Sequence, residues 1–195
     1  MAKRLFDIFF SMFGLVVIAP IFILLSLLII IDSKGGVFYL QTRIGKNLVP
    51  FKLYKFRSMQ SNADKKGLLT VGNNDSRITK VGYYLRKFKL DELPQLINVL
   101  IGNMSFVGPR PEVEKYVKMY NQEQLQVFKV KPGITDWASI KYVNENEILA
   151  KSNTPEQTYI DEIMPAKLKL NLEYVNNNNV IIDIKIILLT IKAIF

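Results

Sequence analysis

The sequence contains no cysteine and no histidine. Without cysteine the chain has no disulfide, no thiol nucleophile and no thiolate metal ligand. Without histidine it lacks the side chain most often used in general acid–base catalysis and a common ligand of zinc. Any catalysis must therefore rely on carboxylates, Lys, Tyr, Arg or a hard metal ion such as magnesium.

Negative charge is also scarce, with 17 Asp and Glu against 26 Lys and Arg and a formal net charge of +9. A basic chain suits an anionic partner, which leaves open nucleic acid, phospholipid headgroups or a phosphorylated substrate. A length of 195 residues predicts one domain with a substantial core. The sequence shows no internal repeat and no linker to a second domain.

The stretch between Asp7 and Asp32 carries no charge over 24 residues. As a helix it would be about 36 Å long, enough to cross a hydrocarbon core of ~30 Å. Proline in the middle of the run, at Ala19-Pro20, disfavours a straight helix. Basic residues flank both ends, and such flanks favour the cytoplasmic side; they are Lys3, Arg4, Lys34, Arg43 and Lys46. A helix–Pro–helix hairpin that enters the membrane and returns fits both features, and an ordinary spanning helix stays open.

The residues after Gly35-Gly36 predict a small β-hairpin, with strands at 37–43 and 51–56 around a turn at 45–47. The second strand leads into Lys55 and Arg57. This alternation of cations and aromatic residues is typical of the solvated face of an edge strand, and it would equally present both cations to a phosphate. The polar stretch 60–76 predicts a loop.

The rest of the chain predicts helices at 77–89, 113–128, 145–172 with breaks at Pro155 and Pro165, and 180–195. The last is apolar but contains Asp183 and two lysines, a pattern typical of a helix on a membrane surface with its lysines at the headgroups. The predicted fold class is α+β and mainly helical. We expect a re-entrant membrane segment at 1–34 and a compact catalytic domain with interfacial amphipathic helices at 35–195.

The chain's clearest chemical signal is Asp91-Glu92, which precedes Pro94 and an apolar run that ends at Gly102. Proline is tolerated in the first turn of a helix, so the acidic pair is predicted at a helix N-terminus, where the dipole would keep both carboxylates ionised. Gly102 is the predicted C-cap. A carboxylate so placed can bind a divalent cation or act as a nucleophile, and an acidic cap without chemistry is the alternative.

Two arginines are candidates for phosphate contacts. Arg86 lies five residues before Asp91 and could face it across a corner between helices, although an exposed basic helix is the alternative. Arg110 stands between Pro109 and Pro111, which hold the backbone extended and restrict it. A guanidinium organised in this way suits bidentate phosphate binding.

Five motifs follow the apolar segment in order, and together they resemble the monotopic polyprenyl-phosphate phosphoglycosyl transferases, a group of bacterial sugar transferases with a re-entrant membrane helix. The motifs are Lys55-Phe56-Arg57-Ser58-Met59, Thr79…Gly82…Arg86, Asp91-Glu92-Leu93-Pro94-Gln95, Gly108-Pro109-Arg110-Pro111 and Lys131-Pro132-Gly133-Ile134-Thr135. Many members continue the last motif as Gly-Trp-Ala-Gln, whereas this chain has Asp136-Trp137-Ala138-Ser139, which leaves the sugar or nucleotide preference open. The chain resembles the minimal catalytic form, without the extra N-terminal membrane helices of larger members.

The resemblance implies an enzyme that transfers a sugar-1-phosphate from a nucleoside-diphosphate sugar, a UDP-sugar above all, to undecaprenyl phosphate and releases UMP. Asp91 would be the nucleophile, forming a covalent aspartyl-phosphosugar, and would lie near or bind Mg²⁺. Glu92 would be its partner, as a metal ligand or in proton transfer. The implied substrate-binding residues are Lys55, Arg57, Arg86, Pro109, Arg110 and Pro111.

The implied setting is the cytoplasmic membrane of a bacterium, with the catalytic domain on its cytoplasmic face and no nucleic acid partner. The reaction would be the first membrane step of a surface glycan such as a capsule, exopolysaccharide, O-antigen or glycoprotein glycan. The oligomeric state stays open, a homo-oligomer included. Two alternatives remain at this point: a non-enzymatic membrane-surface module that binds anionic lipid, and a phosphatase that passes the phosphoryl group to water.

Overall fold

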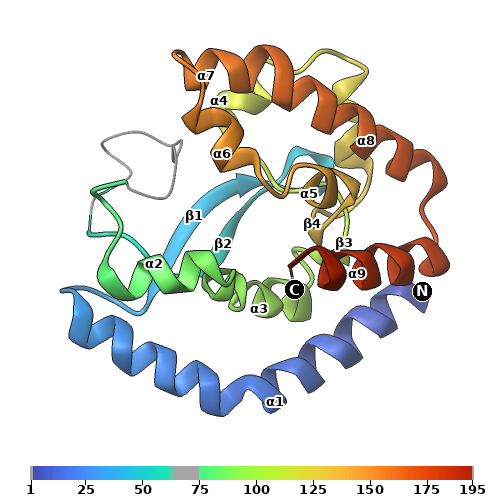
Figure 1. Cartoon of the computed structure of the whole chain (residues 1–195). Helices are drawn as coiled ribbons and strands as arrows, with labels where there is room; N and C mark the ends of the chain where they lie inside the picture. The colour runs from blue at the N-terminus through green and yellow to red at the C-terminus, as the bar shows by residue number, and fades with distance from the viewer. Residues whose placement is uncertain (1, 62, 64–74, 195) are drawn as a thin grey trace.

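The computed structural model describes residues 2–61, 63 and 75–194, so most of the predicted loop at 60–76 lies outside the described residues. The fold is mainly helical, as predicted, and the described residues form two small sheets, of which only the first was predicted (Figure 1). The strands are β1 (Phe38–Ile44), β2 (Pro50–Phe56), β3 (Ser105–Val107) and β4 (Gly133–Thr135). The α-helices are α1 (Ala2–Asp32), α2 (Lys80–Lys87), α3 (Gln95–Ile101), α4 (Glu114–Val117), α5 (Trp137–Lys141), α6 (Glu145–Ala150), α7 (Pro155–Thr158), α8 (Met164–Asn177) and α9 (Val180–Ile194).

Helix α1 is continuous from Ala2 to Asp32, with Pro20 inside it, and Figure 1 shows it bent near its middle. The expected break into two helices at Ala19-Pro20 is therefore a bend within one helix, which is the usual effect of proline in a helix interior. By length and composition, α1 could cross a membrane. Most of its large apolar side chains are exposed.

Both ends of α1 contact the same globular body. Near the start of the helix, the Lys3 ammonium donates to the Tyr174 hydroxyl (2.8 Å) and forms an ion pair of 2.5 Å with Asp183. At the other end, Oδ2 of Asp32 accepts the backbone N–H of Val81 at 2.9 Å. The two ends therefore lie on the same side of the bend.

The predicted hairpin is confirmed. Strands β1 and β2 pair antiparallel, from Phe38 opposite Phe56 to Ile44 opposite Pro50. In the turn, Asn47 and Leu48 have positive φ angles of 56° and 62°, which asparagine accepts more readily than most residues. Phe56 packs with Leu25 of α1 and Leu85 of α2, so the hairpin joins α1 to the rest of the molecule.

The predicted helix at 113–128 is wrong. Helix α4 ends at Val117, and a 3₁₀ segment at Gln124–Lys129 follows. Between them, Asn121 and Gln124 form a reciprocal capping pair, with each side chain accepting the other's backbone N–H at 2.9 Å. This local pairing starts a new segment instead of continuing the helix.

The predicted break at Pro155 is confirmed, because α7 begins there. The break predicted at Pro165 is absent. A π-turn at Tyr159–Ile163 joins α7 to α8 without interruption, and Pro165 lies two residues after this turn, so the helix continues past the proline.

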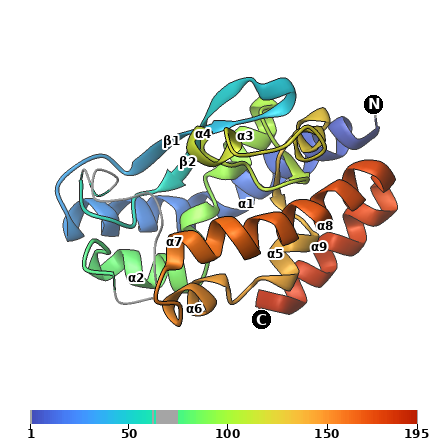
Figure 2. The same cartoon turned by 90° about the horizontal axis from the view of Figure 1, so that it is seen from above.

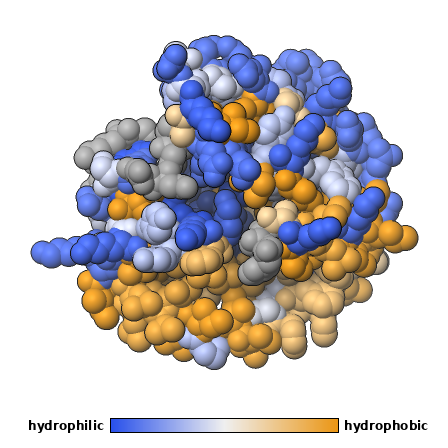
Figure 3. Space-filling model, in the orientation of Figure 1, coloured by the Kyte–Doolittle hydropathy of each residue, from blue (hydrophilic) through white to orange (hydrophobic). Residues whose placement is uncertain are grey.

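Helix α9 has an exposed apolar face formed by Ile181, Ile184, Leu188 and Ile191. Asp183 is buried against Lys3, whereas Lys185 is exposed, with its ammonium 5.8 Å from the centre of the Trp137 ring. Figure 3 shows a broad apolar belt across the lower part of the molecule, where α1 lies, beneath a hydrophilic upper part.

Seen from above, the hairpin runs along one side of the molecule and α6 to α9 along the other (Figure 2). On that second side, Tyr116, Val127, Leu149 and Leu168 belong to one buried apolar cluster, which joins α4, the 3₁₀ segment, α6 and α8. The functional side chains lie between these two sides.

Candidate active site

The acidic pair lies on a short 3₁₀ turn, Leu90–Glu92, immediately before α3. Lys89 has a positive φ of 55°, which separates this turn from α2, and Pro94 precedes the first residue of α3. Gly102 ends α3 with a φ of 98°, as predicted for a C-cap. The predicted position of the pair at the start of a helix is therefore correct to within one turn.

Glu92 is held by two cations. Its carboxylate accepts from the Lys55 ammonium at 3.1 Å and from both terminal nitrogens of the Arg110 guanidinium, one of them at 3.3 Å. Burial alone would raise the pKa of Glu92, but the charges and hydrogen bonds of Arg110 and Lys55 outweigh it and hold that pKa well below its usual value. These cations, rather than the helix dipole, keep Glu92 ionised.

Asp91 is different from its neighbour. Its side chain is buried and lines a cavity, and within the described residues its carboxylate forms no hydrogen bond or ion pair. Burial raises the pKa of Asp91, the charge of Lys55 lowers it, and the charge of Glu92 raises it further. The pair thus consists of one restrained carboxylate and one that is free to react or to bind a ligand.

The cavity beside Asp91 has a volume of about 740 Å³ and opens above the apolar belt, where Figure 3 shows a hydrophilic hollow. It brings together predicted residues from distant parts of the chain. Lys55 comes from β2, Arg86 from α2, and Arg110 from the segment after β3. A cationic cavity around a free carboxylate suits a substrate with a diphosphate group.

Arg110 is positioned by the parallel pairing of β3 with β4, in which Ser105 lies opposite Gly133 and Val107 opposite Thr135. Close approach of the two chains requires glycine: a Cβ on Gly133 would lie 2.1 Å from the backbone nitrogen of Gly108. This pairing places the Gly-Pro-Arg-Pro and Lys-Pro-Gly-Ile-Thr motifs side by side.

The two prolines beside Arg110 have different positions. Pro111 lines the cavity, and its carbonyl accepts from the Arg43 guanidinium at 3.1 Å. Pro109 is not among the residues that line the main cavity, and its carbonyl accepts the N–H of Gly133 at 3.0 Å. Both prolines therefore hold the Arg110 segment in place, and Pro111 alone of the two also faces the cavity.

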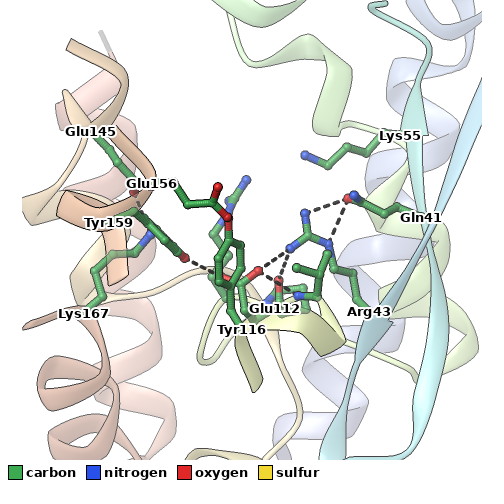
Figure 4. A network of polar contacts seen from close by, with 12 residues as sticks. Gln41, Arg43, Lys55, Glu112, Tyr116, Glu145, Glu156, Tyr159 and Lys167 are labelled. Carbon is green, nitrogen blue, oxygen red and sulfur yellow. Dashed lines mark hydrogen bonds and ion pairs between the residues drawn. The ribbon is translucent and has the colours of Figure 1, made fainter. Parts of the chain in front are cut away.

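Three residues that were not predicted as site residues, Glu112, Arg43 and Tyr159, form a network at the cavity wall (Figure 4). The Glu112 carboxylate accepts from the Arg43 guanidinium (2.9 Å), the Val113 N–H (2.7 Å) and the Tyr159 hydroxyl. Glu112 directly follows the Pro-Arg-Pro motif in the sequence. Through these contacts it connects β1 to Tyr159 at the start of the π-turn. Its position next to that motif was the available signal.

The prediction that Arg57 contacts a phosphate is not supported by its position. The Arg57 side chain is buried and donates to the carbonyls of Ile29 (3.1 Å) and Ser33 (2.7 Å), at the end of α1. A Cβ on Gly35 would lie 1.9 Å from one of its terminal nitrogens, so glycine is required there. Arg57 caps the C-terminal end of the apolar helix, an end that favours positive charge.

A magnesium ion at this cavity would have few protein ligands. Within the described residues, no three acidic side chains cluster as metal ligands. Mg²⁺, however, is commonly bound through one or two carboxylates together with substrate phosphates. Asp91, whose carboxylate is free and borders the cavity, fits such a site.

Comparison with known proteins matches residues 1–195 to the model of the bacterial sugar transferase family. The chain is 39% identical over 193 residues to an Escherichia coli UDP-glucose:undecaprenyl-phosphate glucose-1-phosphate transferase, covering 97% of this chain and 39% of that protein. It is 38% identical over 202 residues to a Rhizobium leguminosarum exopolysaccharide production protein, covering 98% of this chain and 94% of that protein.

A third relative is an Aeromonas hydrophila UDP-N-acetylgalactosamine-undecaprenyl-phosphate N-acetylgalactosaminephosphotransferase, 33% identical over 195 residues. The match covers 98% of this chain and 43% of that protein, so the chain spans less than half of the E. coli and Aeromonas proteins. With a family match over its whole length and these identities, the chain belongs to the bacterial sugar transferase family.

Proposed function

We propose that this enzyme transfers a sugar-1-phosphate from a UDP-sugar to undecaprenyl phosphate and releases UMP. The observation that carries the proposal is the unequal pair in the cationic cavity, with Glu92 held by Lys55 and Arg110 and Asp91 free. The relatives named for undecaprenyl-phosphate sugar transfer support the same reaction class. The name of the Rhizobium relative supports a role in building a surface glycan.

In the first half of the proposed reaction, a carboxylate oxygen of Asp91 forms a bond to the phosphorus that carries the sugar. The bond from that phosphorus to the bridging oxygen breaks, and UMP leaves with the electron pair. Arg86, Lys55 and Arg110 border the cavity and would offset the charge that develops on the phosphoryl oxygens. Glu92 orients two of these cations.

In the second half, an oxygen of the lipid phosphate attacks the same phosphorus and the Asp91 carboxylate is released. No proton transfer is required when the lipid phosphate is fully ionised, which is consistent with a cavity that contains no histidine. While the donor is bound in the first half, Asp91 would also hold Mg²⁺, which would supply further charge neutralisation.

Because the acceptor is a membrane lipid, the enzyme must be associated with the membrane. We infer that α1 enters the cytoplasmic membrane and returns, with the cavity on the cytoplasmic face. Support comes from the bend at Pro20, from the contacts that both ends of α1 make with one body, and from the exposed apolar faces of α1 and α9. In this arrangement the long lipid, held in the membrane, and the soluble nucleotide sugar could both reach the cavity.

Two alternatives predict different behaviour. A non-enzymatic module that binds anionic lipid would not need Asp91 or Glu92, and family membership favours an enzyme. A phosphatase would form the same covalent bond but transfer the group to water.

The test mixes the enzyme with Mg²⁺ and a UDP-sugar in the absence of lipid acceptor. We expect a burst of UMP equal to the enzyme concentration and a protein mass increased by one sugar phosphate on Asp91. Asp91→Asn keeps the shape of the side chain and should abolish the burst without unfolding the protein. UMP that appears only after polyprenyl phosphate is added would contradict the covalent route, and continuous release without acceptor would indicate hydrolysis.

A further inference from the structure

The two walls of the cavity differ in charge. The lower wall in Figure 1, formed by α2 and the turn before α3, carries an excess of positive charge from Arg86, Lys87 and Lys89. On the upper wall, the Lys167 ammonium is paired, 2.7 Å from Oε2 of Glu145, and Glu147 adds a carboxylate that has no ion pair within the described residues. The lower wall therefore suits an anionic group and the upper wall an uncharged polar one.

The upper wall is rigid. Tyr159, at the start of the π-turn, is buried, and its hydroxyl donates to Glu112 (Figure 4). The ammonium of Lys167 lies 5.8 Å from the centre of the Tyr159 ring. The side chains of Lys167 and Glu145 are only 13% and 25% exposed, so their pair is held in one arrangement beside an aromatic ring.

A sugar fits this wall better than a phosphate does. Each hydroxyl of a sugar can donate and accept a hydrogen bond, and a paired ammonium and carboxylate offer one partner of each kind. A diphosphate is drawn instead to unpaired cations, because the carboxylate of Glu145 would repel it. The Tyr159 ring is only 5% exposed, so its part is to hold the Lys167 ammonium in place beside the sugar.

The covalent structure of the donor is a second reason to place the sugar at the upper wall. The sugar is bonded to the phosphate group that Asp91 attacks, whereas the nucleoside is one phosphate further away. Glu145 and Lys167 line the same cavity as Asp91 and Arg110. The sugar, bonded to the phosphate group at Asp91, is therefore the part of the donor that this pair can reach first.

We propose that Glu145 and Lys167, with the Tyr159 ring beside them, bind the sugar of the donor and select which sugar is transferred. This inference rests on the proposed function and extends it from the reaction to the recognition of the substrate. It assigns the upper wall to a neutral hexose and the cations of the lower wall to phosphate groups.

The experiment measures kcat/KM for UDP-glucose, UDP-galactose, UDP-N-acetylglucosamine and UDP-N-acetylgalactosamine with the full-length enzyme in detergent. Glu145→Gln and Lys167→Met each remove one member of the pair and approximately retain its size. Glu114→Gln and Lys118→Met are matched controls, since this exposed pair lies outside the cavity lining. Inhibition by UMP is measured for every variant, and thermal unfolding shows that each is folded.

We expect the two cavity variants to change the ratio of kcat/KM between the best donor and its C4 epimer about tenfold, the effect of one hydrogen bond to a charged group. Inhibition by UMP should not change, and the control variants should behave like the wild type. Equal losses for all four donors, or weaker UMP inhibition in parallel, would place the nucleoside at this wall and overturn the inference.

The outcome also separates the inference from the function on which it rests. A wild-type enzyme that releases no UMP from any of the four donors overturns the proposed function, and the inference with it. An active wild type whose cavity variants keep the same donor ratio overturns the inference alone.

Discussion

The backbone N–H of Arg110 donates a 3.1 Å hydrogen bond to Oδ2 of Asp136, a residue that is completely buried. The other oxygen of Asp136 accepts the N–H of Ser139 at 2.6 Å and caps α5. The residue at which this chain departs from the pattern of many family members therefore supports the backbone of the cavity's arginine. A different residue at position 136 would remove or alter this hydrogen bond to the Arg110 backbone.

Asp136→Asn should lower both stability and activity. An asparagine side chain has one carbonyl oxygen, so it leaves one of the two buried N–H groups without an acceptor, at a cost of about 1–3 kcal/mol. The rate should also fall because the Arg110 backbone is less restrained. Denaturant unfolding in detergent and the UMP burst measure the two effects. The exposed Asp161→Asn is the control, and an Asp136→Asn variant with unchanged stability and rate would contradict the role.

Arg110→Lys should keep the positive charge and lose activity. The guanidinium contacts both oxygens of Glu92, and a lysine ammonium cannot reproduce this two-pronged contact. The loss of one charge-assisted hydrogen bond predicts a fall in kcat/KM of about tenfold or more. Steady-state kinetics with the UDP-sugar donor measure it, and a wild-type rate with lysine would show that only the charge matters.

The acid limb of the burst rate should report the ionisation of Asp91. Burial raises the pKa of this carboxyl above its usual value of 3.8, so activity is lost as pH falls through a raised pKa. The negative charge of Glu92 raises the same pKa. In Glu92→Gln that charge is gone and Lys55 and Arg110 are no longer neutralised, so the acid limb should move to lower pH. A limb that moves to higher pH would show that Glu92 does not act on Asp91 in this way.

Arg57→Met should destabilise the protein without weakening donor binding. The guanidinium donates to two carbonyls at the end of α1. Losing these two hydrogen bonds in a buried setting should lower the free energy of unfolding by about 1–3 kcal/mol. Thermal unfolding in detergent should show the loss, while KM for the UDP-sugar stays at the wild-type value. A large rise in KM with unchanged stability would restore Arg57 as a phosphate contact.

The two ends of α1 should be labelled from the same side of the membrane. The chain has no cysteine, so Ala2→Cys and Lys34→Cys, both at exposed positions, each introduce a single thiol. In sealed inverted vesicles, an impermeant reagent should modify both, because both ends of the helix contact one body. Labelling of only one of the two positions would contradict the re-entrant arrangement. Pro20→Ala should shift the chain toward a straight, spanning helix.

The sequence by itself determined the features that depend on neighbouring residues. The apolar run predicted α1, the glycine and polar residues at 45–47 predicted the turn of the hairpin, and Gly102 predicted the end of α3. The position of Asp91-Glu92 before a helix followed from Pro94 in the same way. These patterns are readable because backbone geometry and hydrophobic periodicity act over a few residues.

Only the tertiary structure decided what each charged side chain does. Lys55 lies in β2 and Arg57 directly follows the end of that strand, yet Arg57 caps α1 and Lys55 holds Glu92. Likewise, Glu112 pairs with Tyr159, 47 residues away, and Lys55, whose charge acts on Asp91, forms its ion pair with the neighbouring Glu92. A charge takes its role from burial and from the partners within a few ångströms, and long-range packing, which local sequence does not encode, brings those partners together.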